Sequence, residues 1–448
     1  MSGQRPQGIS GTCAPIIEEK ETVRGIFMRK TKIICTLGPS TDKDGVLREL
    51  VANGMNVARF NFSHGSYEEH KGRLDMLKAV RAELNKPVAA LLDTKGPEIR
   101  LKEFKNGVEM LEAGQTFTLT TREVEGTKEI CSITYKDLPQ DVHEGGTIML
   151  DDGLIKLAIK SVTDTDIVCE VLNSGKIKTK KGVNVPGVHL SMPYLSQRDR
   201  DDIIFGVQQG FDFIAASFVR TAQDVYDIRN LLNEYDSNIR IIAKIENREG
   251  VNNIDSILSA ADAVMVARGD LGVELPAEVI PNTQRRIVEK CICAKRPVII
   301  ATQMLYSMVK SPRPTRAEVS DVASAIYERV DAVMLSDETA MGDFPVQSVE
   351  TMARIAREIE RDETHFKPMI DMDMVSVNHE ITAQLARSAV RASTNLPIKY
   401  VVLDTKTGRT GRYLAAFRGR KTVMAVCYQL HAQRILALSY GVVPILRN

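Results

Sequence analysis

The chain lacks an excess of charge of either sign, and this bears on its partners. It carries 59 Lys and Arg against 58 Asp and Glu, a formal net charge of +1. Surfaces that bind nucleic acid or anionic membranes usually carry a strong excess of positive charge. The composition therefore predicts no nucleic-acid partner and no membrane-surface partner.

Long apolar runs are also lacking. No run approaches the roughly 20 residues that a membrane-spanning helix needs. The first residues, MSGQRPQGISGTCAPIIEEK, lack the apolar core of a secretory signal. The 7 cysteines include no CxxC spacing, which favours reduced thiols in a reducing compartment. We therefore expect no membrane span and a cytoplasmic location.

Metal and nucleotide motifs of the common kinds are absent too. The sequence has no His-rich cluster, no HExxH and no P-loop pattern. This disfavours zinc hydrolysis and P-loop nucleotide chemistry. A chain of 448 residues exceeds one ordinary core and suggests roughly three domains.

What the sequence does contain is a repeat of short apolar runs that end in polar residues, with amphipathic helical stretches between them. There are eight runs: KIICTLG, VARFNFS, VAALLDTKG, DFIAASFV, RIIAKIEN, AVMVARGD, PVIIATQ and AVMLSDE. Parallel strands that are covered on both faces are apolar almost throughout, and eight such units predict a TIM (β/α)₈ barrel of the α/β class. The alternative is an open, doubly wound sheet, which would use fewer strands and usually a Gly-rich phosphate fingerprint.

The repeat is interrupted once, and this suggests the domain plan. Segments such as TFTLTT and DIVCEVL alternate like exposed strands, which predicts a small β-barrel inserted after the third barrel strand, placed as a lid. The C-terminal part reads as helix and strand in turn. The predicted plan is an N-terminal arm (1–27), a catalytic barrel (28–101 and 188–358), an inserted β lid (102–187) and a C-terminal α/β domain (372–448).

Polar side chains gather at the ends of the predicted strands. Arg59, Asn61 and Ser63 alternate with two phenylalanines, so they share one face and point into the barrel mouth. A buried, unpaired Arg is costly. The trio therefore needs an anionic or metal partner, or it forms a structural ion pair inside the barrel.

The fifth and sixth runs repeat this pattern. Lys244 and Glu246 face the same way, and Asp270 follows Gly269, which lets a ligand approach the backbone. The Lys and the carboxylate either bind a phosphoryl group with its Mg²⁺ or neutralise each other, and Glu246 with Asp270 makes a plausible Mg²⁺ site. Other strand ends add oxygen donors, namely Asp93, Thr94, Thr302, Ser336, Asp337 and Glu338. Hard ligands with several cations fit Mg²⁺-assisted phosphoryl transfer.

Seven segments, in this order, strongly resemble the pyruvate kinase family. They are NFSHG, LDTKGPEIR, KIEN, MVARGDLGVE, ATQML, PRPTRAE and MLSDETA. The resemblance runs from about Lys30 to the C-terminus and implies that the enzyme transfers the phosphoryl group of phosphoenolpyruvate to ADP, giving pyruvate and ATP. It also implies Mg²⁺ (or Mn²⁺) and K⁺ as cofactors.

The resemblance implies a role for each matching residue. Arg59 matches the arginine that holds the phosphoryl group, and Lys244 the lysine that stabilises its charge in the transition state. Gly269, Asp270 and Thr302 match substrate contacts, with Thr302 near the carbon that is protonated. Glu246 and Asp270 match the residues that bind Mg²⁺. The K⁺ site is matched by Asn61, Ser63, Asp93 and Thr94, and Glu98 is the acidic residue that accompanies K⁺ dependence. The nucleotide contacts are matched by Asn61, His64, Arg100 and Lys181. The motifs leave the proton donor open.

The C-terminal part departs from the family. The segment Thr405, Lys406, Thr407, Gly408, Arg409 and Thr410 resembles a sugar-phosphate effector loop, although a basic, solvated loop is the alternative. This domain is shorter than the corresponding domain of the family. Members of the family usually form homotetramers. The family usually has a small residue at Asp337 and often Lys at Met341. The alternatives to an active enzyme are a catalytically silent subunit that binds or regulates, and a barrel lyase acting on related substrates.

Overall fold

The computed structural model describes residues 28–361, 372–377 and 380–447. Its centre is a closed barrel of parallel strands in the order β1-β17-β16-β15-β14-β13-β3-β2. All eight predicted runs form these strands, so the barrel is confirmed and the open sheet is excluded. The strands are β1 (Lys32–Thr36), β2 (Val57–Asn61), β3 (Ala89–Asp93), β13 (Phe213–Ala216), β14 (Arg240–Ile245), β15 (Ala263–Ala267), β16 (Val298–Ala301) and β17 (Ala332–Leu335).

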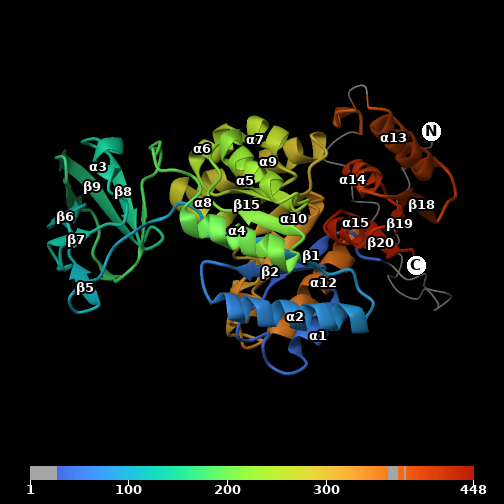
Figure 1. The fold of residues 1–448 in the computed structure, drawn as a ribbon, viewed down its shortest axis with the longest axis horizontal. Helices are drawn as coiled ribbons and strands as arrows, with labels where there is room; N and C mark the ends of the chain where they lie inside the picture. Colours follow the sequence, from blue (N-terminus) through green and yellow to red (C-terminus); the bar gives the residue numbers. More distant parts are fainter. Residues whose placement is uncertain (1–27, 362–371, 378–379, 448) are drawn as a thin grey trace, which may run out of the picture.

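Helices surround the barrel, as Figure 1 shows. Side chains alternate along each strand: Ile34, Leu91 and Met265 belong to the core inside the barrel, whereas their neighbours pack outward on the helices. The helices are α1 (Val46–Asn53), α2 (Tyr67–Glu83), α4 (Gln197–Gln209), α5 (Ala222–Glu234), α6 (Arg248–Asn252), α7 (Ile254–Ala260), α8 (Arg268–Glu274), α9 (Ile280–Cys293), α10 (Arg316–Tyr327), α11 (Asp337–Ala340) and α12 (Pro345–Arg361). Two short 3₁₀ turns, η1 (Ala277–Val279) and η2 (Tyr306–Val309), lie between them.

The local sequence explains where several helices begin. Ser66, Ser196 and Thr315 precede α2, α4 and α10, and each forms a capping box with the acidic residue three positions later. Such a box satisfies two backbone amides that have no partner within the helix. These caps fix where the chain turns from a barrel-mouth loop into the outer ring of helices.

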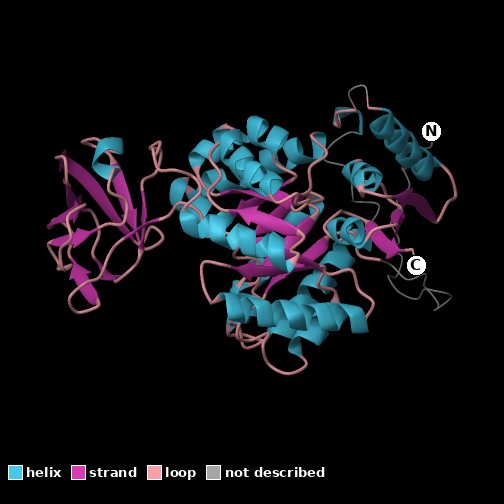
Figure 2. Cartoon of the chain, viewed as in Figure 1, coloured by secondary structure: helices cyan, strands magenta, loops and turns pink. Residues whose placement is uncertain are grey.

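The inserted part stands apart from the barrel, at the left of Figures 1 and 2, and its regular secondary structure consists almost entirely of strands. It has its own apolar core, built around Phe117, Leu157 and Cys169. Its main sheet has seven strands in the order β4-β12-β8-β9-β10-β6-β7, and a two-stranded sheet pairs β11 with β5. The elements are β4 (Ile99–Arg100), β5 (Val108–Leu111), β6 (Thr116–Thr120), β7 (Ile130–Ser132), α3 (Leu138–Asp141), β8 (Thr147–Leu150), β9 (Ile155–Val162), β10 (Asp166–Val171), β11 (Gly175–Lys178) and β12 (Gly182–Asn184).

The C-terminal domain packs on the opposite side of the barrel from the insert (Figure 1). Its three parallel strands have the order β18-β19-β20. The backbone N–H of Gly441 donates to the carbonyl of Lys30 (3.0 Å), and Lys32 Nζ donates to the carbonyl of Val442 (2.6 Å). The elements are η3 (Met372–Met374), α13 (Ile381–Asn395), β18 (Tyr400–Thr405), α14 (Arg409–Ala416), β19 (Thr422–Cys427), α15 (Leu430–Leu436) and β20 (Val442–Leu446).

These three parts agree with the predicted fold class. The predicted N-terminal arm, 1–27, lies outside the described residues, and the proposed residue boundaries of the domains remain a prediction. Within the described ranges, no helix is long and apolar enough to cross a membrane.

Candidate active site

The centre of the site is a buried ion pair at the carboxyl ends of neighbouring strands. Arg59 lies in β2, two residues before its end, and Asp93 ends β3. Arg59 Nε lies 2.5 Å from Asp93 Oδ2. Arg59 also donates through Nη1 to Thr36 Oγ1 (3.0 Å). The structure therefore gives Arg59 the anionic partner that its burial requires, and leaves the partner's second oxygen for another cation.

Lys244, from β14, is that second cation. Its Nζ lies 3.0 Å from Asp93 Oδ1 and 3.0 Å from Glu246 Oε1. Burial by itself lowers the pKa of Lys244, but the two carboxylates outweigh it and hold the pKa above its ordinary value. Lys244 is therefore a fixed positive charge at the mouth.

Sequence reasoning did not find Ser217, which directly follows β13. This strand lies between β3 and β14 in the barrel. Lys244 Nζ donates to Ser217 Oγ (2.7 Å), whose hydroxyl lies 3.1 Å from Asp93 Oδ1 and 2.7 Å from the carbonyl of Thr94. The only signal was its position at the end of the fourth apolar run. Ser217 fixes the direction in which the ammonium and the carboxylate point.

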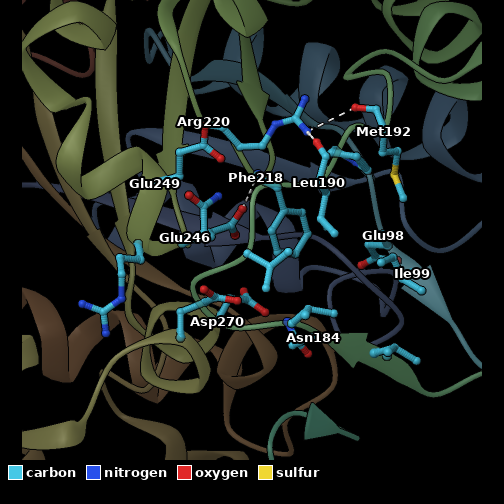
Figure 3. A pocket seen from close by; sticks show the side chains of 18 of the residues that line it. Glu98, Ile99, Asn184, Leu190, Met192, Phe218, Arg220, Glu246, Glu249 and Asp270 are labelled. Atoms are coloured by element: carbon cyan, nitrogen blue, oxygen red, sulfur yellow. Dashed lines mark hydrogen bonds between the residues drawn. The ribbon is translucent and has the colours of Figure 1, made fainter. Parts of the chain in front are cut away.

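Glu246 and Asp270 both line the cavity drawn in Figure 3, and Glu246 Oε1 lies 3.0 Å from Lys244 Nζ. Burial raises the pKa of Glu246, with repulsion from Asp270 adding to it and Lys244 opposing it. Burial likewise raises the pKa of Asp270. Phe218 N donates to Glu246 Oε2 (2.6 Å) and fixes that carboxylate. A buried carboxylate and a half-buried one side by side are a pair that a cation stabilises.

No group of three or more His, Cys, Asp or Glu side chains suited to a metal occurs in the part of the chain that the structure describes. Two carboxylates are still enough for Mg²⁺, because this ion keeps several water or substrate oxygens among its ligands. The donor set therefore fits Mg²⁺ and does not fit a zinc site built from protein side chains alone.

Thr302 and Gly269 meet at the ends of β16 and β15. Gly269 N donates to Thr302 Oγ1 (2.7 Å), and Thr302 has a left-handed backbone, φ 68°. That conformation is uncommon for a β-branched residue and costs energy. The strain and the amide together hold the Thr302 hydroxyl at the mouth of the barrel.

The remaining predicted barrel residues lie along the ends of β2 and β3. Asn61 is paired with Asp93 in the strand register, and its Oδ1 accepts from Ser63 N (3.2 Å). The carbonyl of His64 is 2.9 Å from a ring nitrogen of His70. The structure thus brings Asn61, Ser63, Asp93 and Thr94 into one oxygen-rich corner.

A cavity of about 560 Å³ opens between the barrel and the insert. Glu246 and Asp270 line its barrel side, and Arg100 and Lys181 line its insert side. Lys181 Nζ lies 2.7 Å from Asp151 Oδ1, and Arg100 Nη2 lies 2.7 Å from Glu98 Oε2. The predicted nucleotide residues of the insert therefore face the predicted metal residues across one cavity.

The segment 405–410 lies in the C-terminal domain, far from this cavity (Figure 1). As predicted, it joins a strand to a helix: Thr405 ends β18, and Gly408, with φ 79°, precedes α14. Arg409 pairs with Glu380 at 3.1 Å. The other departures, Asp337 and Met341, are both exposed.

Comparisons with known proteins identify the family of the chain. A family profile described as pyruvate kinase, barrel domain, matches residues 28–349, and one described as pyruvate kinase, alpha/beta domain, matches residues 383–448. A pyruvate kinase of Staphylococcus saprophyticus is 48% identical over 424 residues, covering 94% of this chain and 72% of its own length. One from Staphylococcus aureus is 46% identical over 423 residues, with the same two coverages, 94% and 72%.

A solved structure gives the same result. The crystal structure of a pyruvate kinase from Cryptosporidium parvum superposes with a TM-score of 0.89 at 40% identity, covering 94% of this chain and 87% of that one. Barrel, mouth residues and relatives lead to one conclusion: the chain belongs to the pyruvate kinase family, whose glycolytic enzymes transfer the phosphoryl group of phosphoenolpyruvate to ADP.

Proposed function

We propose that the mouth of the barrel performs this transfer and that Arg59 and Lys244 bind the moving phosphoryl group. The observation that carries the proposal is the buried triad of Arg59, Asp93 and Lys244, joined by contacts of 2.5 Å and 3.0 Å. Phosphoryl transfer passes through a loose, charge-rich transition state, so cations held in place beforehand supply much of the catalysis. Asp93 keeps both cations in position before substrate arrives.

Glu246 and Asp270 are the residues that we propose for Mg²⁺. Their burial and mutual repulsion are the features that a divalent cation would relieve. The ion would act as a Lewis acid on phosphoryl oxygens. Thr302 would contact substrate near the carbon that is protonated, and its hydroxyl is oriented by Gly269 N.

For K⁺ we propose Asn61, Ser63, Asp93 and the backbone of Thr94. These groups offer the oxygen donors that alkali cations require. In the structure Asp93 is already paired with Arg59 and Lys244, but a carboxylate has about four lone-pair sites and can accept a further cation. Glu98, on the insert side of the cavity, is the acidic residue that accompanies K⁺ dependence in the family.

Asn61, His64, Arg100 and Lys181 are the nucleotide contacts that we propose. Arg100 and Lys181 belong to the insert, so movement of the insert toward the barrel would bring them onto the nucleotide phosphates. Such closure also excludes water from the reacting groups and limits hydrolysis.

We further propose a sugar-phosphate effector for 405–410, a homotetrameric assembly and a cytoplasmic location. The loop precedes the N-terminus of α14 and carries Lys and Arg, which suits a phosphate. All six cysteines in the described residues are free thiols, which suits a reducing compartment. Titrating activity with candidate sugar phosphates while measuring the mass of the assembly tests the first two.

A coupled assay for pyruvate tests the main proposal. Phosphoenolpyruvate, ADP, Mg²⁺ and K⁺ together should give steady turnover. Omission of ADP or Mg²⁺ should abolish it, and omission of K⁺ should slow it. No turnover with all four present would favour the silent subunit instead.

A further inference from the structure

The insert is joined to the barrel by two connections, and the returning one is the more informative. Residues 185–196 lead from β12 back to α4. The side chains of Leu190 and Met192 pack on the core of the insert, whereas Tyr194 is buried in the core of the barrel. The segment around residues 190–192, here called the return segment, therefore lies where the core of the insert gives way to the core of the barrel.

Arg220 holds the return segment from the barrel side. Its Nη1 donates to the carbonyls of Leu190 (2.9 Å) and Met192 (3.1 Å), as the dashed lines in Figure 3 show. Asp224 orients the guanidinium, with Oδ1 3.2 Å from Nη2 and Oδ2 3.3 Å from Nε. A planar guanidinium that is fixed in this way donates in set directions, and its charge strengthens both bonds.

The insert binds Ser191, the residue between Leu190 and Met192. Ser191 N and Ser191 Oγ donate to the two carboxylate oxygens of Asp141, at 3.0 Å and 2.9 Å. Tyr135 OH, also from the insert, donates to Asp141 Oδ2 (2.8 Å). Successive residues of the return segment are thus bound alternately by the barrel and by the insert, and the segment transmits the position of one to the other.

The backbone next to Arg220 is bound to Glu246, one of the two carboxylates proposed for Mg²⁺. Two residues earlier, Phe218 N donates to Glu246 Oε2 (2.6 Å). Asn253 Nδ2 donates to the carbonyl of Arg220 (3.0 Å), so the backbone there is held as well. A single short loop after β13 therefore contacts both the proposed metal carboxylate and the return segment.

We propose that Arg220 is a positioning residue for the reaction: it holds the return segment so that Lys181 of the insert faces Glu246 and Asp270 across the cavity. The proposal rests on the nucleotide role proposed for Lys181. Without the guanidinium, binding of the nucleotide would have to order the insert, and part of the binding free energy would be lost. Phosphoenolpyruvate, whose proposed contacts all lie on the barrel, would be affected much less.

The test compares four variants with the unsubstituted chain. Arg220→Met removes both carbonyl bonds, and Arg220→Lys keeps the positive charge but loses the planar guanidinium that donates in set directions. Asp141→Ala loosens the same segment from the insert side, remote from Glu246. Arg229→Met is the matched control, because Arg229 is a neighbouring arginine on α5 whose ion pair, with Asp262 at 2.5 Å, does not involve the insert.

We expect Arg220→Met to raise KM for ADP by about tenfold or more, the effect of losing charge-assisted hydrogen bonds. KM for phosphoenolpyruvate should change by less than about threefold. Arg220→Lys should recover part of the loss, and Asp141→Ala should also raise KM for ADP. Hydrogen exchange of the amides in 188–193 should quicken in the Arg220→Met and Asp141→Ala chains and stay unchanged in Arg229→Met.

Two results would overturn the proposal. One is a KM for ADP that stays unchanged in Arg220→Met or Asp141→Ala while exchange quickens. The other is an equal rise in KM for both substrates, which indicates general damage to the barrel. If Arg220→Met does not fold, the Arg220→Lys and Asp141→Ala chains decide by the same criteria. Hydrogen exchange reports on the return segment without any turnover, and Lys181→Met tests the nucleotide role of Lys181 by itself. Failure of the role proposed for Arg220 can therefore be told apart from failure of the role proposed for Lys181.

Discussion

Lys244 and Asp93 form a buried ion pair at the mouth of the barrel, with Nζ 3.0 Å from Oδ1, although 151 positions separate them along the chain. The whole insert lies between their strands in sequence, and closure of the barrel brings them together. Around this pair lie the cation of Arg59 and the carboxylates of Glu246 and Asp270. Three carboxylates against two cations leave an excess of negative charge, which favours a bound divalent cation.

The first prediction concerns that cation. Asp270→Asn should weaken binding of Mn²⁺, used as a probe for Mg²⁺, by at least about tenfold, since even the loss of an outer partner of a metal ligand costs about 10–100-fold. Electron paramagnetic resonance of free Mn²⁺ measures this without turnover. Asp337→Asn removes an exposed carboxylate of α11 and is the control. Equal affinities in the two variants would contradict the assignment.

The second prediction concerns K⁺. Ser63→Ala removes one proposed oxygen donor, so half-maximal stimulation should need several-fold more K⁺, roughly what one neutral hydrogen-bonding group contributes. Titration of the rate with K⁺ at constant ionic strength measures this. Ser256→Ala, on α7, is the matched control. The assignment fails if the two titration curves coincide.

The third prediction concerns the contact between barrel and C-terminal domain. Asp331 is 1% exposed and accepts from Val298 N of the barrel (3.0 Å) and from Tyr440 N of the C-terminal domain (2.9 Å). It also pairs with Arg418. Asp331→Asn leaves Arg418 buried without its counter-ion, which should cost about 3–5 kcal/mol.

Denaturant unfolding measures this cost. Asp75→Asn removes an exposed carboxylate that pairs with Lys71 and should change stability by less than about 1 kcal/mol. A similarly small change for Asp331→Asn would show that the buried pair does not hold the two domains together.

The fourth prediction concerns pH. Asp212 directly precedes β13, is 2% exposed and accepts from Ala90 N (2.8 Å). Burial raises the pKa of its carboxyl from 3.8 to about 6. The folded chain therefore holds this proton more tightly than the unfolded chain does. The resulting stabilisation is complete below about pH 4 and is lost as the pH rises through about 6.

Asp212→Asn should remove this dependence. Relative to the unsubstituted chain, its stability should improve by up to about 3 kcal/mol between pH 4 and pH 7. Thermal or denaturant unfolding across that range measures the difference. A difference that is constant with pH would show that the carboxyl is not perturbed.

The barrel and most of its mouth could be predicted from the sequence because their signals are local. A strand covered on both faces is a continuous apolar run, and a charged residue such as Lys244 within such a run stands out at once. Alternation along β2 was enough to put Arg59 and Asn61 on the inner face. The sequence likewise predicts that the segment 405–410 connects a strand to a helix.

Other features depend on contacts that no local signal reports. Ser217 is an ordinary residue until closure of the barrel sets its hydroxyl against Lys244 and Asp93. Arg220 reaches two carbonyls about thirty positions away, and Ser191 meets Asp141 across fifty. The strand order of the insert also escapes prediction, because alternation identifies strands but does not say which strands pair.

The account depends above all on Lys244. Pyruvate formation by Lys244→Met, measured beside the unsubstituted chain and the control Lys290→Met on the outer helix α9, tests it most directly. The account predicts a loss of about 10²–10³-fold or more in kcat, with circular dichroism unchanged and Lys290→Met fully active. A Lys244→Met chain that is folded and turns over at the unsubstituted rate would contradict it.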